Sequence, residues 1–303
     1  EFETVPIRRH EDVLLRRIYD RMPLKLDKIQ FENPFHKTFV LLQAHFSRLT
    51  LPADLAQDQR DILNRVLTLL NACVDVMSSG AMLNAIVAME ISHMCVQAVW
   101  DRDSPLRQVP HFTAATIQRC QARGIHDVYA LADVLPDMGQ HERDELLQLN
   151  KRQLADVATL TNEFPYVDIE FDILDKEKLD SASTIILQAK LERDVDEEEE
   201  EPSDPTAIAP FYPSPKMTAW WLVIGDPGTN SLLSIKRVTI AKTLDVRLEF
   251  MLPAGMHDKL KLYLMCDSYI GADRELEVPA LHVAQGEEDE ELDDEDNIEM
   301  PDA

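Results

Sequence analysis

The spacing of the apolar residues changes once along the chain, at Tyr166, and this change constrains the fold more than any other feature. Before Tyr166, apolar residues recur every three or four positions, which is typical of amphipathic helices. After it, Val167, Ile169, Phe171 and Ile173 alternate with carboxylates, which is the pattern of a half-buried antiparallel strand. We therefore predict a multidomain protein with a helical first part and a strand-rich second part.

The helical part divides in two. Residues 1–107 predict a bundle, in which Asn33 caps a helix that opens on Pro34. Two longer helices are expected from Leu55 to Ser78 and from Met82 to Trp100. Residues 108–165 predict a smaller helix-loop-helix unit, with segments capped by Thr113 and Asn150 and a short helix between them at 128–135.

Residues 166–285 predict seven short strands, and that number in roughly 120 residues matches an immunoglobulin-like or fibronectin type III-like β-sandwich. Trp220 to Arg237 read as a hairpin, because Gly225, Pro227 and Gly228 interrupt two apolar runs. The seven strands are expected near 167–173, 184–191, 219–224, 232–240, 244–252, 260–268 and 275–283.

The formal charge of −26 is unevenly distributed. Residues 1–190 hold 21 basic and 28 acidic side chains, whereas residues 191–303 hold 9 and 28. Two acidic runs, Asp194 to Glu201 and Glu287 to Asp296, account for most of the difference. Because like charges repel and cannot pack, we expect an acidic loop at 193–216 and a disordered tail at 286–303 that either solubilise the chain or dock a partner.

The sequence lacks the common catalytic and nucleotide-binding motifs. It contains no G-x-x-x-x-G-K-[ST], G-x-G-x-x-G, H-E-x-x-H or G-x-S-x-G, so we expect no catalytic residues, cofactor or metal.

The four cysteines are far apart and read as buried free thiols. Neither a signal peptide nor an apolar run of membrane-spanning length is present, and the first residue is Glu1, so a fragment of a larger cytosolic or nuclear protein is expected.

Two sets of residues are candidates for contact with a ligand. A polar stripe runs along the helix predicted at 55–78, and it is either a solvated face or the lining of a groove for an extended ligand. For RNA it is poor, because it contains two carboxylates and only Arg60 and Arg65 nearby could reach phosphates. The stripe consists of Gln57, Asp61, Asn64, Thr68, Asn71 and Asp75.

The second set is the tryptophan pair Trp220 and Trp221. Neighbouring residues of a strand point to opposite faces, so at most one ring is expected to belong wholly to a core. The other is a candidate partner contact, since tryptophan is enriched at binding hot spots. The alternative is that it packs beneath the acidic loop.

Four segments, in this order, resemble the Sec63-type unit that follows the helicase core in Ski2-like RNA helicases. They are RRHEDVLL from Arg8, HKTFVLLQAHFSRL from His36, WDRDSPLRQVPHF from Trp100 and WWLVIGDPGTNSLLSIKR from Trp220. The resemblance extends to about residue 285, and it is closest to the last such unit of a spliceosomal member that unwinds paired U4 and U6 RNA.

The resemblance implies a nuclear, noncatalytic accessory and protein-interaction module of U5 snRNP in mRNA splicing, with helicase motor domains of the same chain and other spliceosomal proteins as partners. The striped helix would correspond to the family's ratchet helix, although Asp61 and Asp75 depart from an RNA-gripping version. Two alternatives remain open. One is an RNA-contacting helicase accessory domain, and the other is a translocation-related protein that shares the unit.

Overall fold

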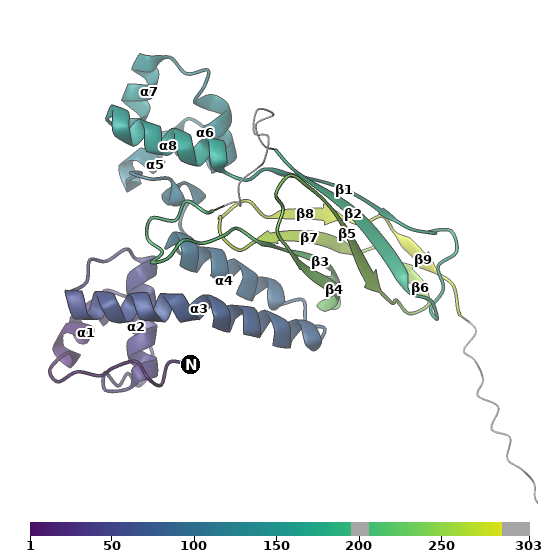
Figure 1. The fold of residues 1–303 in the computed structure, drawn as a ribbon, viewed down its shortest axis with the longest axis horizontal. Coiled ribbons are helices and arrows are strands. Elements are labelled where there is room, and N and C mark those ends of the chain that lie inside the picture. Colours follow the sequence, from purple (N-terminus) through teal and green to yellow (C-terminus); the bar gives the residue numbers. More distant parts are fainter. Residues whose placement is uncertain (195–205, 287–303) are drawn as a thin grey trace, which may run out of the picture.

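The computed structural model describes residues 1–194 and 206–286, and it combines helices with antiparallel sheets. Figure 1 shows the helices in two lobes at one end of the molecule and the strands at the other. The acidic runs predicted to be disordered lie outside the described residues, except for Asp194. Among the described residues, no helix has the length and apolarity needed to cross a lipid bilayer.

The first lobe is the bundle, and its predicted helices are confirmed. Asn33 accepts hydrogen bonds from the backbone N–H groups of Phe35 and His36, which begins the second helix where expected. Val40, Leu41, Ile62 and Leu63 contribute to its apolar core. The helices are α1 (Asp12–Tyr19), α2 (Pro34–Phe46), α3 (Ala53–Ser79) and α4 (Ala85–Gln97).

The second lobe has four α-helices, one more than the sequence pattern indicated. Thr113 and Asn150 cap helices as expected, and Asn150 forms a reciprocal capping box with Gln153. The helix at 140–147 was not predicted, because its sequence QHERDELL has few apolar residues to mark a buried face. The elements are η1 (Pro105–Gln108), α5 (Ala114–Ala122), α6 (Val128–Val134), α7 (Gln140–Leu147) and α8 (Lys151–Glu163).

All strand pairs are antiparallel, and they form sheets with the orders β1-β2-β5, β4-β3-β7-β8 and β6-β9. Six predicted strands are present, and the seventh is divided in two near Pro279, which has no N–H to continue a ladder. The strands are β1 (Val167–Ile173), β2 (Ile185–Arg193), β3 (Trp220–Asp226), β4 (Ser231–Val238), β5 (Thr243–Phe250), β6 (Gly255–His257), β7 (Lys261–Cys266), β8 (Arg274–Glu277) and β9 (Leu281–Val283).

Strand β3 separates two cores. Leu222 on one face belongs to a core that also contains Leu187 of β2 and Leu248 of β5, so the two larger sheets bury side chains together. Val223 on the other face packs with residues of α3 and α4, including Val74. Because both faces are covered, β3 is a continuous apolar run and not an alternating one.

The hairpin turn between β3 and β4 is held by the connection from α3 to α4. The backbone N–H of Leu83 donates to the carbonyl of Asn230 at 3.1 Å, and the N–H of Leu232 donates to the carbonyl of Ala81 at 2.9 Å. This close approach depends on Gly225, where a Cβ atom would lie 2.5 Å from Leu83 Cδ1 and 2.8 Å from the Ser231 carbonyl oxygen.

We expect Gly225→Ala to lower the free energy of unfolding by about 1–3 kcal/mol, because the added methyl group overpacks the contact between hairpin and helices. Gly80→Ala is the matched control, since a Cβ there meets its neighbours at 3.4 Å or more. The control should change stability by less than about 1 kcal/mol. Urea unfolding of both variants measures the difference, and equal losses would contradict this account of Gly225.

His45 makes the bundle sensitive to acid. Its Nε2 lies 2.7 Å from the Cys95 carbonyl oxygen, and burial lowers the pKa of His45 from 6.5 to about 4. The unfolded chain therefore takes up a proton first, and up to about 3 kcal/mol of stability is lost as the pH falls from about 6.5 to about 4. His45→Gln should flatten the dependence of the melting temperature on pH in this interval; an unchanged slope would exclude His45 as a cause.

Candidate interaction surfaces

The polar stripe lies where the sequence places it. All six of its residues are on α3 and all are exposed. Gln57 donates a hydrogen bond to Asp61 at 3.0 Å, so part of the stripe is linked along the helix. Asp61 also borders a hollow of about 80 Å³ between α3 and the N-terminal segment. The groove-lining role of the stripe stays a prediction.

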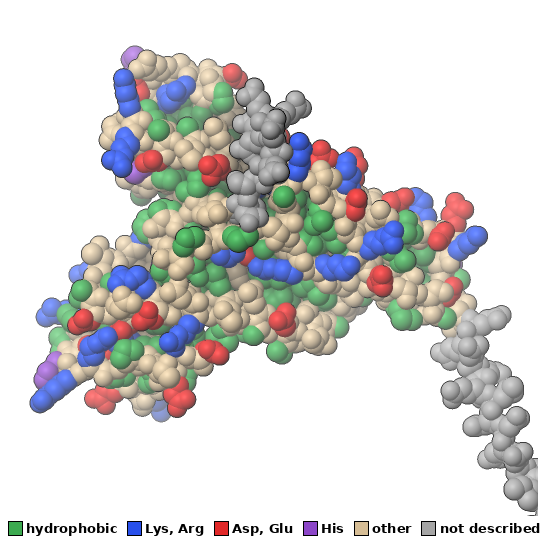
Figure 2. All heavy atoms as spheres, viewed as in Figure 1, with side chains coloured by type: hydrophobic (Ala, Val, Ile, Leu, Met, Phe, Trp, Pro, Cys, Tyr) green, Lys and Arg blue, Asp and Glu red, His purple; other side chains and the backbone are tan. Residues whose placement is uncertain are grey.

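The two arginines beside the stripe already have polar partners. Arg60 donates to Gln57 at 2.5 Å, and Arg65 donates to the Thr4 hydroxyl at 2.9 Å. In Figure 2, basic and acidic side chains are interspersed over the helical lobes and do not form one continuous basic field on the face shown. Phosphate binding depends on clustered cationic groups, so this surface is poorly suited to RNA.

A segment that precedes β3 crosses the stripe. We call residues 206–216 the strap. Tyr212 of the strap donates its hydroxyl to the Leu63 carbonyl at 3.0 Å, and Ser214 donates to Asn64 Oδ1 at 2.8 Å. Part of the polar face of α3 is therefore in contact with the protein's own chain.

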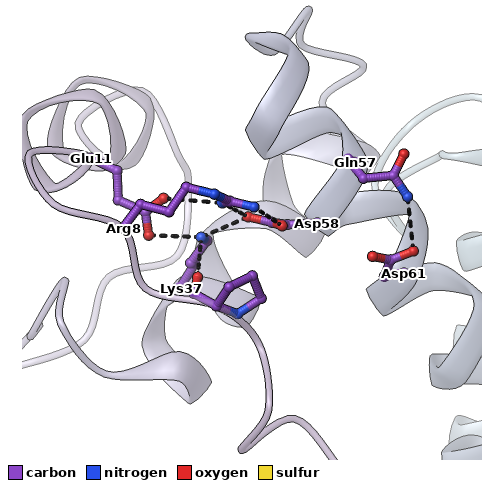
Figure 3. A network of polar contacts seen from close by, with 7 residues as sticks. Arg8, Glu11, Lys37, Gln57, Asp58 and Asp61 are labelled. Atoms are coloured by element: carbon purple, nitrogen blue, oxygen red, sulfur yellow. Dashed lines mark hydrogen bonds and ion pairs between the residues drawn. The ribbon is translucent and has the colours of Figure 1, made fainter.

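A buried ion network fixes the N-terminal half of α3 against α2 (Figure 3). The Lys37 ammonium lies 2.7 Å from Glu11 and 2.7 Å from Asp58, and it also donates to the Pro6 carbonyl at 2.5 Å. Arg8 contacts both carboxylates, and its Nη2 donates to Asp58 Oδ1 at 2.8 Å. The Lys37 side chain is fully buried.

The network changes the proton affinities of its members. The hydrogen bond to Asp58 raises the pKa of Arg8 above its usual value. Burial by itself would raise the pKa of Asp58, but the hydrogen bonds from Arg8 and Lys37 outweigh it and leave that pKa below its usual value. Asp58 therefore stays ionised. The positive charges of Arg8 and Lys37 next to α3 thus already have a carboxylate partner.

The network was not predicted from the sequence, although the sequence contains a sign of it. Lys37 and Asp58 are charged residues of opposite sign at core-facing positions of two helices, among apolar residues such as Val40 and Ile62. A charge at such a position needs a buried partner. The pattern therefore indicated a pair, but not which residues would form it.

Both tryptophan rings are buried, which differs from the prediction made from the sequence. Trp220 is 1% exposed in the core between the larger sheets, and Trp221 is 4% exposed in the core between β3 and the bundle. The prediction that at most one ring lies in a core is wrong, because helices cover the outer face of β3. Arg237 lies over the Trp221 ring at 3.7 Å. Neither ring presents the surface that a partner contact requires.

The remaining site expectations concern metals and cysteines. Among the residues that the structure describes, no group of three or more His, Cys, Asp or Glu side chains is arranged to hold a metal ion. The four cysteines are free thiols; Cys95, Cys120 and Cys266 are buried, as the sequence predicts, whereas Cys73 is only half-buried.

Comparison with known proteins shows one family match over most of the chain. Residues 1–279 match the Sec63 Brl domain. The chain is 45% identical over 278 residues to a Schizosaccharomyces pombe protein named pre-mRNA-splicing factor brr2, with 91% of this chain and 12% of that protein covered. It is 41% identical over 294 residues to the Homo sapiens U5 small nuclear ribonucleoprotein 200 kDa helicase, with 97% and 13% covered.

A third relative has a different name. The chain is 39% identical over 284 residues to a Dictyostelium discoideum protein named activating signal cointegrator 1 complex subunit 3-like, with 92% of this chain and 12% of that protein covered. In each comparison the chain spans about an eighth of the relative's length.

Proposed function

Since the chain belongs to the Sec63 Brl domain family, we propose that it is a noncatalytic accessory and protein-interaction module of a spliceosomal RNA helicase. In this proposal it works in the nucleus, within U5 snRNP, during U4/U6 unwinding and pre-mRNA splicing. The observation that carries the proposal is 41–45% identity, over nearly the whole chain, to proteins named as a splicing factor and as a U5 helicase.

The noncatalytic role is supported by the sequence, which contains no phosphate-loop motif of the kind that ATP hydrolysis by a helicase requires. The motor domains of the same polypeptide and other splicing proteins are the proposed partners. The alternative of a module from a cointegrator-type relative is favoured by one observation, the 39% identity to the Dictyostelium protein.

RNA contact through α3 is the second candidate function. It is favoured by the exposed polar stripe, which extends along a helix of 27 residues. It is disfavoured by the partners that Arg60 and Arg65 already have, and by the bond from Ser214 of the strap to Asn64. We therefore rank protein contact above RNA contact.

We also infer that the strand-rich part is an immunoglobulin-like or fibronectin type III-like sandwich. The seven longer strands divide into sheets of three and four, and strand β5 joins the sheet of β1 and β2 while β7 joins that of β3. This exchange between sheets is the Greek-key type of connection found in such sandwiches. A rigid sandwich joined to two helical lobes is a suitable scaffold for protein contacts.

Cross-linking mass spectrometry of the purified chain in splicing extract tests the proposal. We expect cross-links to spliceosomal proteins and no ATP turnover by the chain alone. A chain that hydrolyses ATP, or that cross-links to splicing proteins no more than an unrelated acidic protein does, would overturn it. Binding of single-stranded RNA with a steep dependence on salt would instead favour the second candidate.

A further inference from the structure

A hollow of about 620 Å³ lies where the two helical lobes meet the strap, and we call it the junction groove. Its lining comes from Arg48 after α2, from residues 109–112 before α5, from α8, and from Ile208, Pro210 and Phe211 of the strap. Figure 1 shows the segment before β3 running through the junction between the lobes. The volume is in the range of pockets that bind ligands in proteins.

The groove combines an apolar floor with an exposed aromatic ring. Val109 and Phe112 are buried beneath it, whereas Phe211 is 46% exposed at its edge. Arg48 lies over the Phe211 ring at 4.1 Å. Together with Pro210 and the half-buried Ile208, the Phe211 ring gives the hollow an apolar wall, and clefts lined mostly by apolar groups with a few polar ones are typical of binding sites.

A second hollow of about 440 Å³ shares Arg48 and Phe112 with the junction groove and adds a cluster of positive charge. Arg102 and Arg107 line it together with one carboxylate, Asp103, which lies 3.4 Å from Arg107. Among the described residues, no carboxylate is within ion-pair distance of Arg48 or Arg102. Three guanidinium groups therefore face one carboxylate, although the chain as a whole carries a formal charge of −26.

The position of Arg48 is fixed by the fold. Its backbone φ of 51° ends helix α2 in the left-handed region, and its Nε and Nη2 donate to the carbonyls of Ala98 and Gln97 at 3.0 and 2.9 Å. These bonds complete the C-terminus of α4 and explain why an arginine is held there. The third nitrogen, Nη1, has no hydrogen-bond partner among the described residues, so it remains available to an acceptor.

We propose that the junction groove and its arginine cluster bind a short peptide segment of a partner protein, with one large apolar side chain flanked by carboxylates. The apolar side chain lies against Phe112 and Phe211, and the carboxylates meet Arg48, Arg102 and Arg107. This inference rests on the proposed interaction role and adds to it a place and a class of partner. The exposed Arg102 can bind a carboxylate through two parallel hydrogen bonds, and Arg48 can add one from Nη1.

A peptide is favoured over single-stranded RNA for two reasons. The groove has a single exposed phenyl ring, that of Phe211, whereas sites for single-stranded RNA stack successive bases on several aromatic rings. The three arginines also line one hollow beside Phe112 and do not extend along a groove, whereas a single-stranded nucleic acid is followed by a basic groove that spans several phosphates. Asp156 of α8 lies at the edge of the junction groove, where its Oδ2 is 2.7 Å from His111 Nε2.

The test uses the 303-residue chain and a set of fluorescein-labelled peptides with Phe, Tyr, Trp, Leu or Met at the centre and Asp or Glu on both sides. Fluorescence anisotropy is expected to detect binding by at least one peptide, and lysine in place of its carboxylates should abolish that binding. Arg102→Glu and Phe211→Ser should each weaken it about tenfold or more, as expected for loss of one charge-assisted or one apolar contact.

Matched variants distinguish the groove from general surface effects. Arg17→Glu changes an exposed arginine of α1, and Phe35→Ser removes an exposed phenyl ring of α2; both should leave peptide affinity unchanged. Thermal melting checks that all four variants are folded.

Two outcomes would overturn the proposal. One is equal binding by the lysine peptides, and the other is no binding by any peptide of the set; if a polyuridine oligonucleotide then binds and Arg102→Glu weakens it, the occupant is RNA. If peptides fail but the chain still cross-links to splicing proteins, the interaction role stands and only the assignment to this groove fails. If a peptide binds at the groove but no splicing protein cross-links, the groove stands and the spliceosomal role fails.

Discussion

Replacing Lys37 by methionine is expected to lower the free energy of unfolding by about 3–5 kcal/mol. The Lys37 ammonium is fully buried and contacts the carboxylates of Glu11 and Asp58, each at 2.7 Å. Without it, two buried carboxylates share only the guanidinium group of Arg8, and an uncompensated buried charge is costly. Urea unfolding followed by circular dichroism measures the loss.

Two further variants show whether the charge is the cause. Lys28→Met changes an exposed lysine of the same lobe and should alter stability by less than about 0.5 kcal/mol. The double variant with Lys37→Met and Asp58→Asn should lose less than the sum of the single changes, because the second substitution removes one unpaired carboxylate. A loss below about 1 kcal/mol for Lys37→Met would contradict a structural role for the network.

Alanine at Trp220 or at Trp221 is expected to cost about 3–5 kcal/mol in each case. Both rings are buried, at 1% and 4% exposure, but in different cores. Trp220→Ala opens a cavity between the sheets, whereas Trp221→Ala opens one between β3 and the bundle and also removes the aromatic face beneath Arg237. Thermal melting and urea unfolding measure both effects.

The two tryptophan variants also test the corrected interpretation of the hairpin. If Trp221 were a partner contact, its alanine variant would lose binding to splicing proteins while melting at the same temperature. Because the Trp221 ring is buried, we expect instead that Trp221→Ala lowers the melting temperature. Phe35→Ala, which truncates a ring that is 53% exposed, is the control and should leave the melting temperature nearly unchanged.

Local patterns predicted the elements well because each depends on neighbours in sequence. Asn33, Thr113 and Asn150 cap helices where the sequence places caps, since a side chain and the N–H group it accepts from are two or three residues apart. The alternation after Tyr166 marked β1 for the same reason. Helix α7 was missed, because its short, polar sequence has no periodic apolar face.

The candidate sites depended on contacts between distant residues, and there the sequence was less informative. The exposure of the stripe on α3 followed from helical spacing. The strap that crosses it joins residues about 150 positions apart, Ser214 and Asn64, and no local pattern indicated that contact. The junction groove likewise combines residues near 48, 110, 156 and 210.

The sequence by itself determined most of the segments that become helices and strands, although not α7, and the family to which the chain belongs. Spacing, capping and long ordered segments act locally, so they can be read without a fold. Only the tertiary structure decided that β3 is covered on both faces, which places Trp220 and Trp221 in separate cores. The physical reason is that burial is set by what packs against a residue, and the helices that cover Trp221 lie more than a hundred residues before it in the chain.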